Sequence, residues 1–144
     1  MKNVKIIKAL QSLAATNGGL LLPETVVTAA KDKRSPLHRK FTWKDDEAAH
    51  QWRLQQARML INTAVEILPA TTHETPIWVS LSTDRQTHNG YRATIAVCSD
   101  EELREQLLKD ALHDLSSWQQ RYRALKELTD IFKAADSVRH KHAA

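Results

Sequence analysis

The last 54 residues of the chain contain neither glycine nor proline, so no helix breaker interrupts residues 91–144. Within this stretch, apolar side chains recur at alternating spacings of three and four residues over about four heptads. A repeat of 3.5 residues is the seam through which two helices pack in a coiled coil. The pattern predicts a long C-terminal helical arm that forms a homodimer through Leu108, Leu115, Trp118, Tyr122, Leu125 and Phe132.

A capping box, Ser-Asp-Glu-Glu at residues 99–102, marks the start of this arm, with Ser99 as the N-cap. The apolar stripe is widened by Leu107, Leu112 and Leu128. A wider stripe is also typical of a helix that packs against its own chain. Two alternatives to a dimer seam therefore stay open: packing within one chain, and a break near residues 115–117 that folds the arm into two helices.

Positive charge is concentrated in the first third of the chain. The whole protein carries a net charge of +4, whereas residues 1–44 hold nine Lys and Arg against two acids. Six of these cations lie within residues 31–44, and Lys2, Lys5 and Lys8 add to them. Such a surface favours contacts to nucleic-acid phosphates, and the alternative is a solvated loop. The predicted DNA-binding residues are Lys31, Lys33, Arg34, His38, Arg39, Lys40, Lys44, Arg85 and Arg92.

Two short helices are expected before the basic segment. Apolar residues at helical spacing predict a helix over residues 4–15, and Asn17-Gly18 provides its stop. Pro23 suits the first position of a second helix. Two short helices joined across Gly18-Gly19 resemble part of a helix-turn-helix.

A third helix is expected after the break at Ser35-Pro36, with Thr42 as its N-cap. Three acids, Asp45, Asp46 and Glu47, would then lie at the positive end of the helix dipole. Trp43 is expected to pack at the entrance of this helix. The buried face is predicted to comprise Ala49, Trp52, Ala57, Leu60, Ile61 and Ala64.

Residues 65–98 are predicted to form β-structure. Apolar and polar side chains alternate in residues 77–82 and 91–97, which predicts an antiparallel hairpin with one buried face. The connection ends in Asn89-Gly90, which tolerates a positive φ, and residues 65–68 could supply a third strand. The tip is either a wing along a nucleic-acid backbone or a solvated loop, and its basic residues are Arg85, His88 and Arg92.

The sequence lacks the motifs of catalysis and cofactor binding. Its seven histidines fall in no metal-ligand spacing, and there is no GxGxxG, P-loop or GxSxG. We therefore expect no enzyme activity, no metal and no cofactor. The single cysteine, Cys98, is expected to be buried at a strand end, and its isolation fits a reducing compartment. No apolar run is long enough to span a membrane.

Residues 18–61 contain three motifs: Ser35-Pro36-Leu37-His38, then Phe41, Trp43 and Asp45-Asp46, and finally WRLQQAR from Trp52 to Arg58. This SPLH-x2-F-x-W-x-DD…WR-x2-QAR pattern resembles an uncharacterised family of short proteins encoded by bacteriophages and prophages. The later segments VSLSTDR, GYR and SDEELREQLLKDAL extend the likeness over most of the chain. The resemblance implies an origin rather than an activity. The family pattern is less basic after the second helix, which marks the cations of residues 33–40 as particular to this chain.

The sequence thus predicts an α+β protein with a basic domain at residues 1–98, made of helices and a β-hairpin, and a helical arm at residues 99–144. The expected function is that of a phage- or prophage-type DNA-binding protein, acting in regulation or DNA organisation in the cytoplasm of a bacterial host. It would be a homodimer that contacts the phosphate backbone with weak sequence specificity. The alternative is a non-enzymatic module that binds and modulates a host or phage protein.

Overall fold

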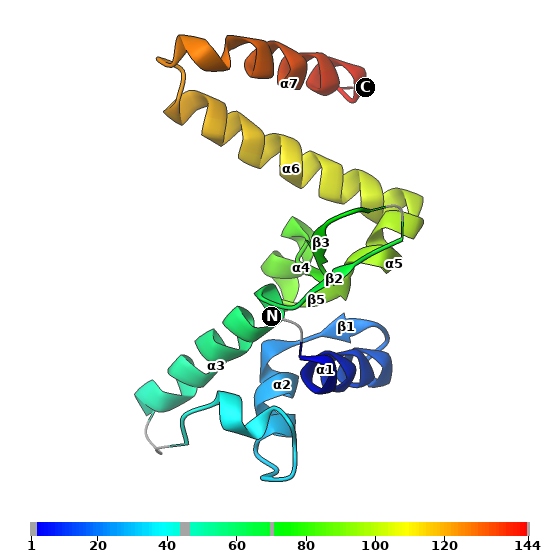
Figure 1. Cartoon of the computed structure of the whole chain (residues 1–144), viewed down its shortest axis with the longest axis vertical. Coiled ribbons are helices and arrows are strands. Elements are labelled where there is room, and N and C mark those ends of the chain that lie inside the picture. Colours follow the sequence, from blue (N-terminus) through cyan, green and yellow to red (C-terminus); the bar gives the residue numbers. More distant parts are fainter. Residues whose placement is uncertain (1–2, 44–46, 70, 144) are drawn as a thin grey trace. The chain divides into compact units, whose positions relative to one another are not determined.

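The computed structural model describes residues 3–43, 47–69 and 71–143 and has the expected α+β architecture (Figure 1). The chain divides into two compact units, residues 1–100 and residues 101–144. The first unit combines helices with short antiparallel strands, and the second is helical. In the described parts of the chain, no helix combines the length and the apolar character needed to cross a membrane.

The first helix, α1 (Val4–Thr16), forms where the periodicity predicts it. Its N-terminus is capped by the side chain of Asn3, which accepts a hydrogen bond from the Ile6 amide at 3.4 Å. The helix ends at the predicted Asn17-Gly18: Asn17 is its C-cap, Gly18 has a φ of 62°, and the amide of Gly19 donates to the Ala14 carbonyl at 2.8 Å. A residue without Cβ adopts this left-handed conformation at little cost, so the predicted stop is confirmed.

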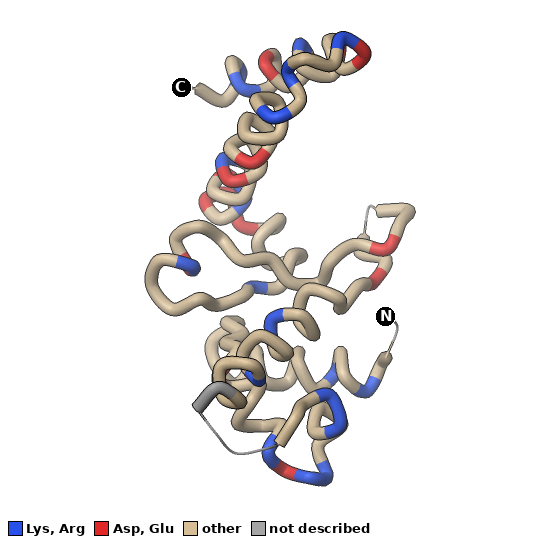
Figure 2. Tube along the Cα trace, turned by 90° about the vertical axis from the view of Figure 1, so that its left-hand side faces the viewer, with Lys and Arg blue, Asp and Glu red and all other residues tan. Residues whose placement is uncertain are grey.

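A short strand, β1 (Leu20–Leu21), follows α1 and leads into α2 (Pro23–Ala30). Pro23 takes the first helical position, as predicted. The two helices are therefore joined through a strand rather than through a simple turn. The connection from α2 to the next long helix carries a short 3-10 helix, η1 (His38–Lys40), and most of the Lys and Arg positions of this unit gather there and at the start of α1 (Figure 2).

The third long helix, α3 (Glu47–Asn62), covers most of the predicted span. Thr42 is hydrogen-bonded to the side chain of Gln56 in the middle of this helix. The Thr42 amide donates to Gln56 Oε1 at 3.1 Å, and the Thr42 hydroxyl accepts from Gln56 Nε2 at 3.4 Å. The predicted cap at Thr42 depends on Asp45 and Asp46, which lie outside the described residues, as does the side chain of Glu47.

The three-stranded sheet has the order β1-β5-β4, with every pairing antiparallel. The predicted hairpin is present as β4 (Trp78–Val79) paired with β5 (Tyr91–Ala93), but both strands are shorter than predicted. Helix α4 (Ser82–Thr87) fills the connection. The segment Val65–Ile67 does form a strand, β2, but it pairs with β3 (Glu74–Pro76) in a separate two-stranded ribbon.

The second half of the predicted strand at residues 91–97 is a helix, α5 (Thr94–Ser99). The Thr94 hydroxyl donates to the Pro76 carbonyl at 2.7 Å and its amide donates to the Ile77 carbonyl at 2.8 Å, and the ladder ends there. Cys98 is exposed on this helix, so the prediction of a buried thiol was wrong. The prediction of Ser99 as a helix N-cap was also wrong, because its hydroxyl donates to the Ile95 carbonyl at 2.7 Å inside α5.

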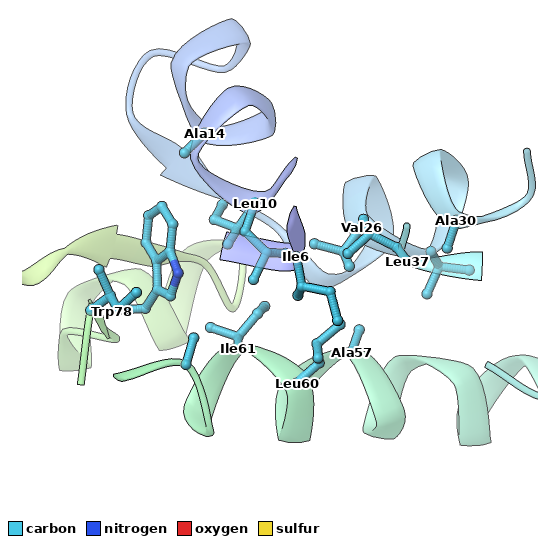
Figure 3. Packing of buried hydrophobic residues seen from close by; sticks show 14 of the residues in the cluster. Ile6, Leu10, Ala14, Val26, Ala30, Leu37, Ala57, Leu60, Ile61 and Trp78 are labelled. Carbon is cyan, nitrogen blue, oxygen red and sulfur yellow. The ribbon is translucent and has the colours of Figure 1, made fainter. Parts of the chain in front are cut away.

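The core of the N-terminal unit lies between α1, α2, α3 and the sheet (Figure 3). On α3 the prediction is confirmed for Ala57, Leu60, Ile61 and, just beyond the helix, Ala64, all of which are buried. It was wrong for Trp52, whose exposed fraction is 51%. Arg53 points inward in its place and is 8% exposed.

The C-terminal unit is a helical hairpin rather than one continuous arm. Helix α6 (Glu101–Arg121) turns back through η2 (Lys126–Leu128) into α7 (Thr129–Lys141). The reversal follows α6 at residues 122–128, so the alternative of two helices is correct but its break lies further along the chain. Trp118 contacts Phe132 edge-on, with ring centroids 5.8 Å apart, which places two predicted seam residues against each other within one chain.

Candidate nucleic-acid interface

Six basic side chains line a single hollow of about 800 Å³ in the N-terminal unit. Two of them lie three residues apart on α1, and four come from the connection between α2 and α3 (Figure 2). Among the described lining residues there is no acid. We call this hollow the basic groove and define it by Lys5, Lys8, Lys33, Arg34, Arg39 and Lys40.

The loop wall of the basic groove is held by a turn and a core anchor. Leu37 is 1% exposed and fixes the middle of the loop in the core. The Leu37 amide donates to the Ser35 hydroxyl at 3.3 Å, and the His38 amide donates to the Ser35 carbonyl at 3.1 Å. The cations on both sides of this anchor, Lys33 and Arg39 among them, therefore reach the same hollow.

A stack of three side chains supports the same loop from the side of α3. The rings of His38 and Trp43 are parallel, with centroids 5.0 Å apart, and the Arg53 guanidinium lies 5.6 Å from the Trp43 ring centroid. The Trp43 indole donates to the His38 carbonyl at 3.0 Å. Because the Ala30 carbonyl can only accept, its 2.8 Å contact with His38 Nδ1 assigns the proton to that nitrogen. His38, predicted as a DNA ligand, is thus a half-buried support for its neighbours Arg39 and Lys40.

Asp32 is the acid closest in sequence to the groove cations, and it is engaged by Arg34. The Arg34 amide donates to Asp32 Oδ1 at 2.9 Å, and the guanidinium lies 3.3 Å from Oδ2. The amide hydrogen bond, followed by that of the guanidinium, holds the pKa of Asp32 below its ordinary value. Asp32 is therefore charged at neutral pH and offsets part of the groove's charge. Within the described chain, Lys5, Lys8, Lys33 and Arg39 pair with no carboxylate.

The basic side chains predicted at the hairpin tip have structural roles instead. Arg92 donates from Nε and Nη2 to the two carboxylate oxygens of Asp84 at 2.7 and 2.8 Å, and Asp84 is 3% exposed. This hydrogen bonding raises the pKa of Arg92 above its ordinary value. Arg85 donates from its guanidinium to the Ser80 carbonyl. Arg92 therefore joins β5 to α4, because the buried Asp84 carboxylate needs a partner, whereas Arg85 joins α4 to Ser80, just before the helix.

Two further residues were predicted as DNA ligands, Lys31 and Lys44. Lys31 is exposed at the end of α2 and is not among the lining residues, and Lys44 lies outside the described residues. Lys5 and Lys8, which line the groove, were expected to add positive charge but were not among the predicted DNA-binding residues. Their spacing of three residues on a helix is the signal that places both on one face.

A second hollow, of about 250 Å³, lies on α3 and shares the lining residue Lys40 with the basic groove. Its other lining residues include Gln56, Met59 and Thr63. Trp52 lies on the same face of α3, four residues before Gln56 and seven before Met59. Both Trp52 and Met59 are exposed, at 51% and 45%.

No group of His, Cys, Asp and Glu that could hold a metal ion occurs among the described residues.

A scan against protein-family models, a search of curated proteins and a search of solved structures each found no match to this chain.

Proposed function

We propose that this protein binds DNA through the basic groove and acts in regulation or DNA organisation as a phage- or prophage-type protein. One observation carries the proposal: six cations from two separate segments converge on one hollow, with no acid among its described lining residues. Lys and Arg on such a surface neutralise phosphates and displace counterions. These contacts position a nucleic acid without reading its sequence, which implies weak sequence specificity. The phage or prophage origin rests on the family resemblance of residues 18–61.

The support of the loop favours binding over a merely solvated run of charge. Leu37 anchors the loop, and the His38–Trp43–Arg53 stack holds its far end. A loop whose backbone is already held in place loses less conformational entropy when a phosphate binds.

Fluorescence anisotropy with a labelled DNA duplex of arbitrary sequence, measured over a salt series, tests the proposal. If most of the groove cations contact phosphates, log Kobs should fall against log[salt] with a slope of roughly −3 to −5. A chain that fails to bind in low salt, or that binds with a slope near zero, would contradict the proposal.

We propose in addition that the C-terminal helical hairpin forms a homodimer. No described side chain of α6 is buried, and on α7 only Ala135 is, among the described residues. Two of the exposed apolar residues, Ile131 and Val138, lie seven residues apart on one face of α7, at 51% and 40% exposure. Residues 101–144 hold equal numbers of acids and bases, so two copies approach without net repulsion. Two such hairpins could bury this face as a four-helix bundle.

The double variant Ile131→Asp/Val138→Asp should be monomeric under conditions where the wild type is dimeric, because two carboxylates would be buried in the bundle. Sedimentation velocity measures the difference, and the apparent stability of the wild type should rise with protein concentration. Lys133→Gln, on the same helix, is the matched control and should leave the dimer intact. A wild type that sediments as a monomer at high micromolar concentration would refute the dimer.

The alternative function is a module that binds and modulates a host or phage protein. The exposed apolar face of α7 also favours this function, since such faces serve as contact surfaces for other chains. A monomeric wild type that binds no DNA would support it over the DNA-binding proposal.

A further inference from the structure

We propose that the polynucleotide taken by the basic groove is an unpaired strand, whose backbone lies in the groove and whose bases stack on Trp52. The inference rests on the proposed function, because it requires the groove to bind a nucleic acid. It adds the class of nucleic acid and the side chain that contacts the bases.

The cations of the basic groove come from two walls. Lys5 and Lys8 lie on the α1 side, and the remaining four cations lie on the loop side of one hollow of about 800 Å³. A single backbone can lie between the two walls and meet cations from both sides. A duplex presents a stiff, convex surface, whereas positively charged grooves that follow one backbone are typical of single-strand binding proteins.

Lys40 links the basic groove to α3. Lys40 lines both the basic groove and the smaller hollow beside Met59. Gln56, which also lines the smaller hollow, is fixed by two hydrogen bonds with Thr42. A strand that leaves the groove past Lys40 therefore meets the face of α3 that carries Met59 and Trp52.

The face of α3 that carries Met59 also exposes an aromatic ring. Trp52 is 51% exposed, although an indole of this size is usually buried in the core. Exposed aromatic rings beside a cationic groove are the platforms on which unpaired bases stack, and every base has a face suited to this contact. Residues 48–62 contain no Asp or Glu, and the Glu24 carboxylate that approaches this stretch from α2 lies 3.4 Å from His50 Nε2. The exposed neighbours Gln51 and Gln55 are neutral amides.

The test is an anisotropy titration of the full-length chain with labelled oligonucleotides of about 20 nucleotides, a length that exceeds the usual site of a single-strand binding domain. Three ligands are compared: single-stranded DNA, single-stranded RNA of the same sequence, and the DNA duplex. The variants are Trp52→Ala, Trp52→Phe, which keeps a stacking ring, and Ile95→Ala, which removes an exposed apolar side chain from α5. Urea unfolding verifies that each variant is folded, and the wild-type comparison of strand against duplex needs no variant.

We expect the wild type to bind a single strand about 10-fold more tightly than the duplex, and Trp52→Ala to lose about 10-fold on the single strand. Trp52→Phe should retain most of the affinity, and Ile95→Ala all of it. Tighter binding of single-stranded RNA than of single-stranded DNA would support an unpaired strand as the ligand and identify its sugar as ribose. Equal or tighter binding of the duplex, or an unchanged affinity of Trp52→Ala, would overturn this inference and leave the proposed function standing. Binding of none of the three ligands would overturn both.

Discussion

Replacing the four loop cations, in the variant K33Q/R34Q/R39Q/K40Q, should lower the affinity for DNA by on the order of 10³-fold at about 0.1 M salt. Each phosphate contact contributes close to one unit to the salt dependence, so the slope of log Kobs against log[salt] should become less steep by about three to four units. The loop wall carries four of the six groove cations, and only Lys5 and Lys8 remain in the variant.

Two matched variants separate a local effect from a change in total charge. Replacing Lys126 and Lys133 with Gln, in the C-terminal unit, should leave the salt slope unchanged. Asp32→Asn should act in the opposite direction, because it keeps an acceptor for the Arg34 amide while removing the charge that engages the guanidinium. An unchanged slope in the fourfold variant would remove the loop from the interface.

The variant Arg92→Ala should lower the free energy of unfolding by about 3 kcal/mol, because it leaves the Asp84 carboxylate buried without its guanidinium partner. Urea unfolding followed by circular dichroism measures the change. The affinity of the folded variant for DNA should match that of the wild type, since Arg92 does not line the basic groove.

Arg85→Ala is the control for this prediction. Arg85 is an exposed residue of α4, the helix that also carries Asp84, and its guanidinium donates to the backbone carbonyl of Ser80. The cost of Arg85→Ala should be about 1 kcal/mol or less. The double variant D84N/R92A should be more stable than Arg92→Ala alone, since an amide is buried at lower cost than a charged carboxylate. Equal stability of Arg92→Ala and Arg85→Ala would contradict the structural role assigned to the Asp84–Arg92 pair.

The helices of the N-terminal unit were predictable because their signals are local. The apolar spacing of α1, the left-handed stop before β1 and Pro23 at the start of α2 each act within a few residues. The inward face of α3 was only partly predictable. Arg53 is buried where its neighbour Trp52 was expected to be. Its guanidinium lies over the ring of Trp43, ten residues earlier in the chain, and this contact is not visible in the pattern of the helix.

The β-region and the C-terminal arm show where periodicity loses its meaning. The alternating pattern of residues 91–97 ends as a strand at Ala93, because Thr94 bonds to Pro76, 18 residues away. A 3-4 spacing of apolar residues is the same for one long helix and for two antiparallel helices. The reversal at residues 122–128 carries no glycine or proline, so the sequence offers no signal for it.

The site was predicted in composition but not in shape. The run of charge at residues 31–44 was visible, and so was the helical spacing of Lys5 and Lys8, but only the folded chain brings α1 and the loop to the same hollow. The removal of Arg85 and Arg92 from the predicted interface could not be foreseen, because Asp84 has no local feature that marks it as buried.

Lysine footprinting of the wild-type chain tests the central claim most directly, because it locates the interface without any substitution. The chain is acetylated with and without a saturating oligonucleotide, once single-stranded and once duplex, and each lysine is quantified by mass spectrometry. We predict that the bound oligonucleotide protects Lys5, Lys8, Lys33 and Lys40 in the basic groove and leaves Lys109, Lys126, Lys133 and Lys141 in the C-terminal unit as reactive as in the free chain. Unchanged reactivity of the groove lysines in the bound chain, or protection confined to the C-terminal unit, would contradict this prediction.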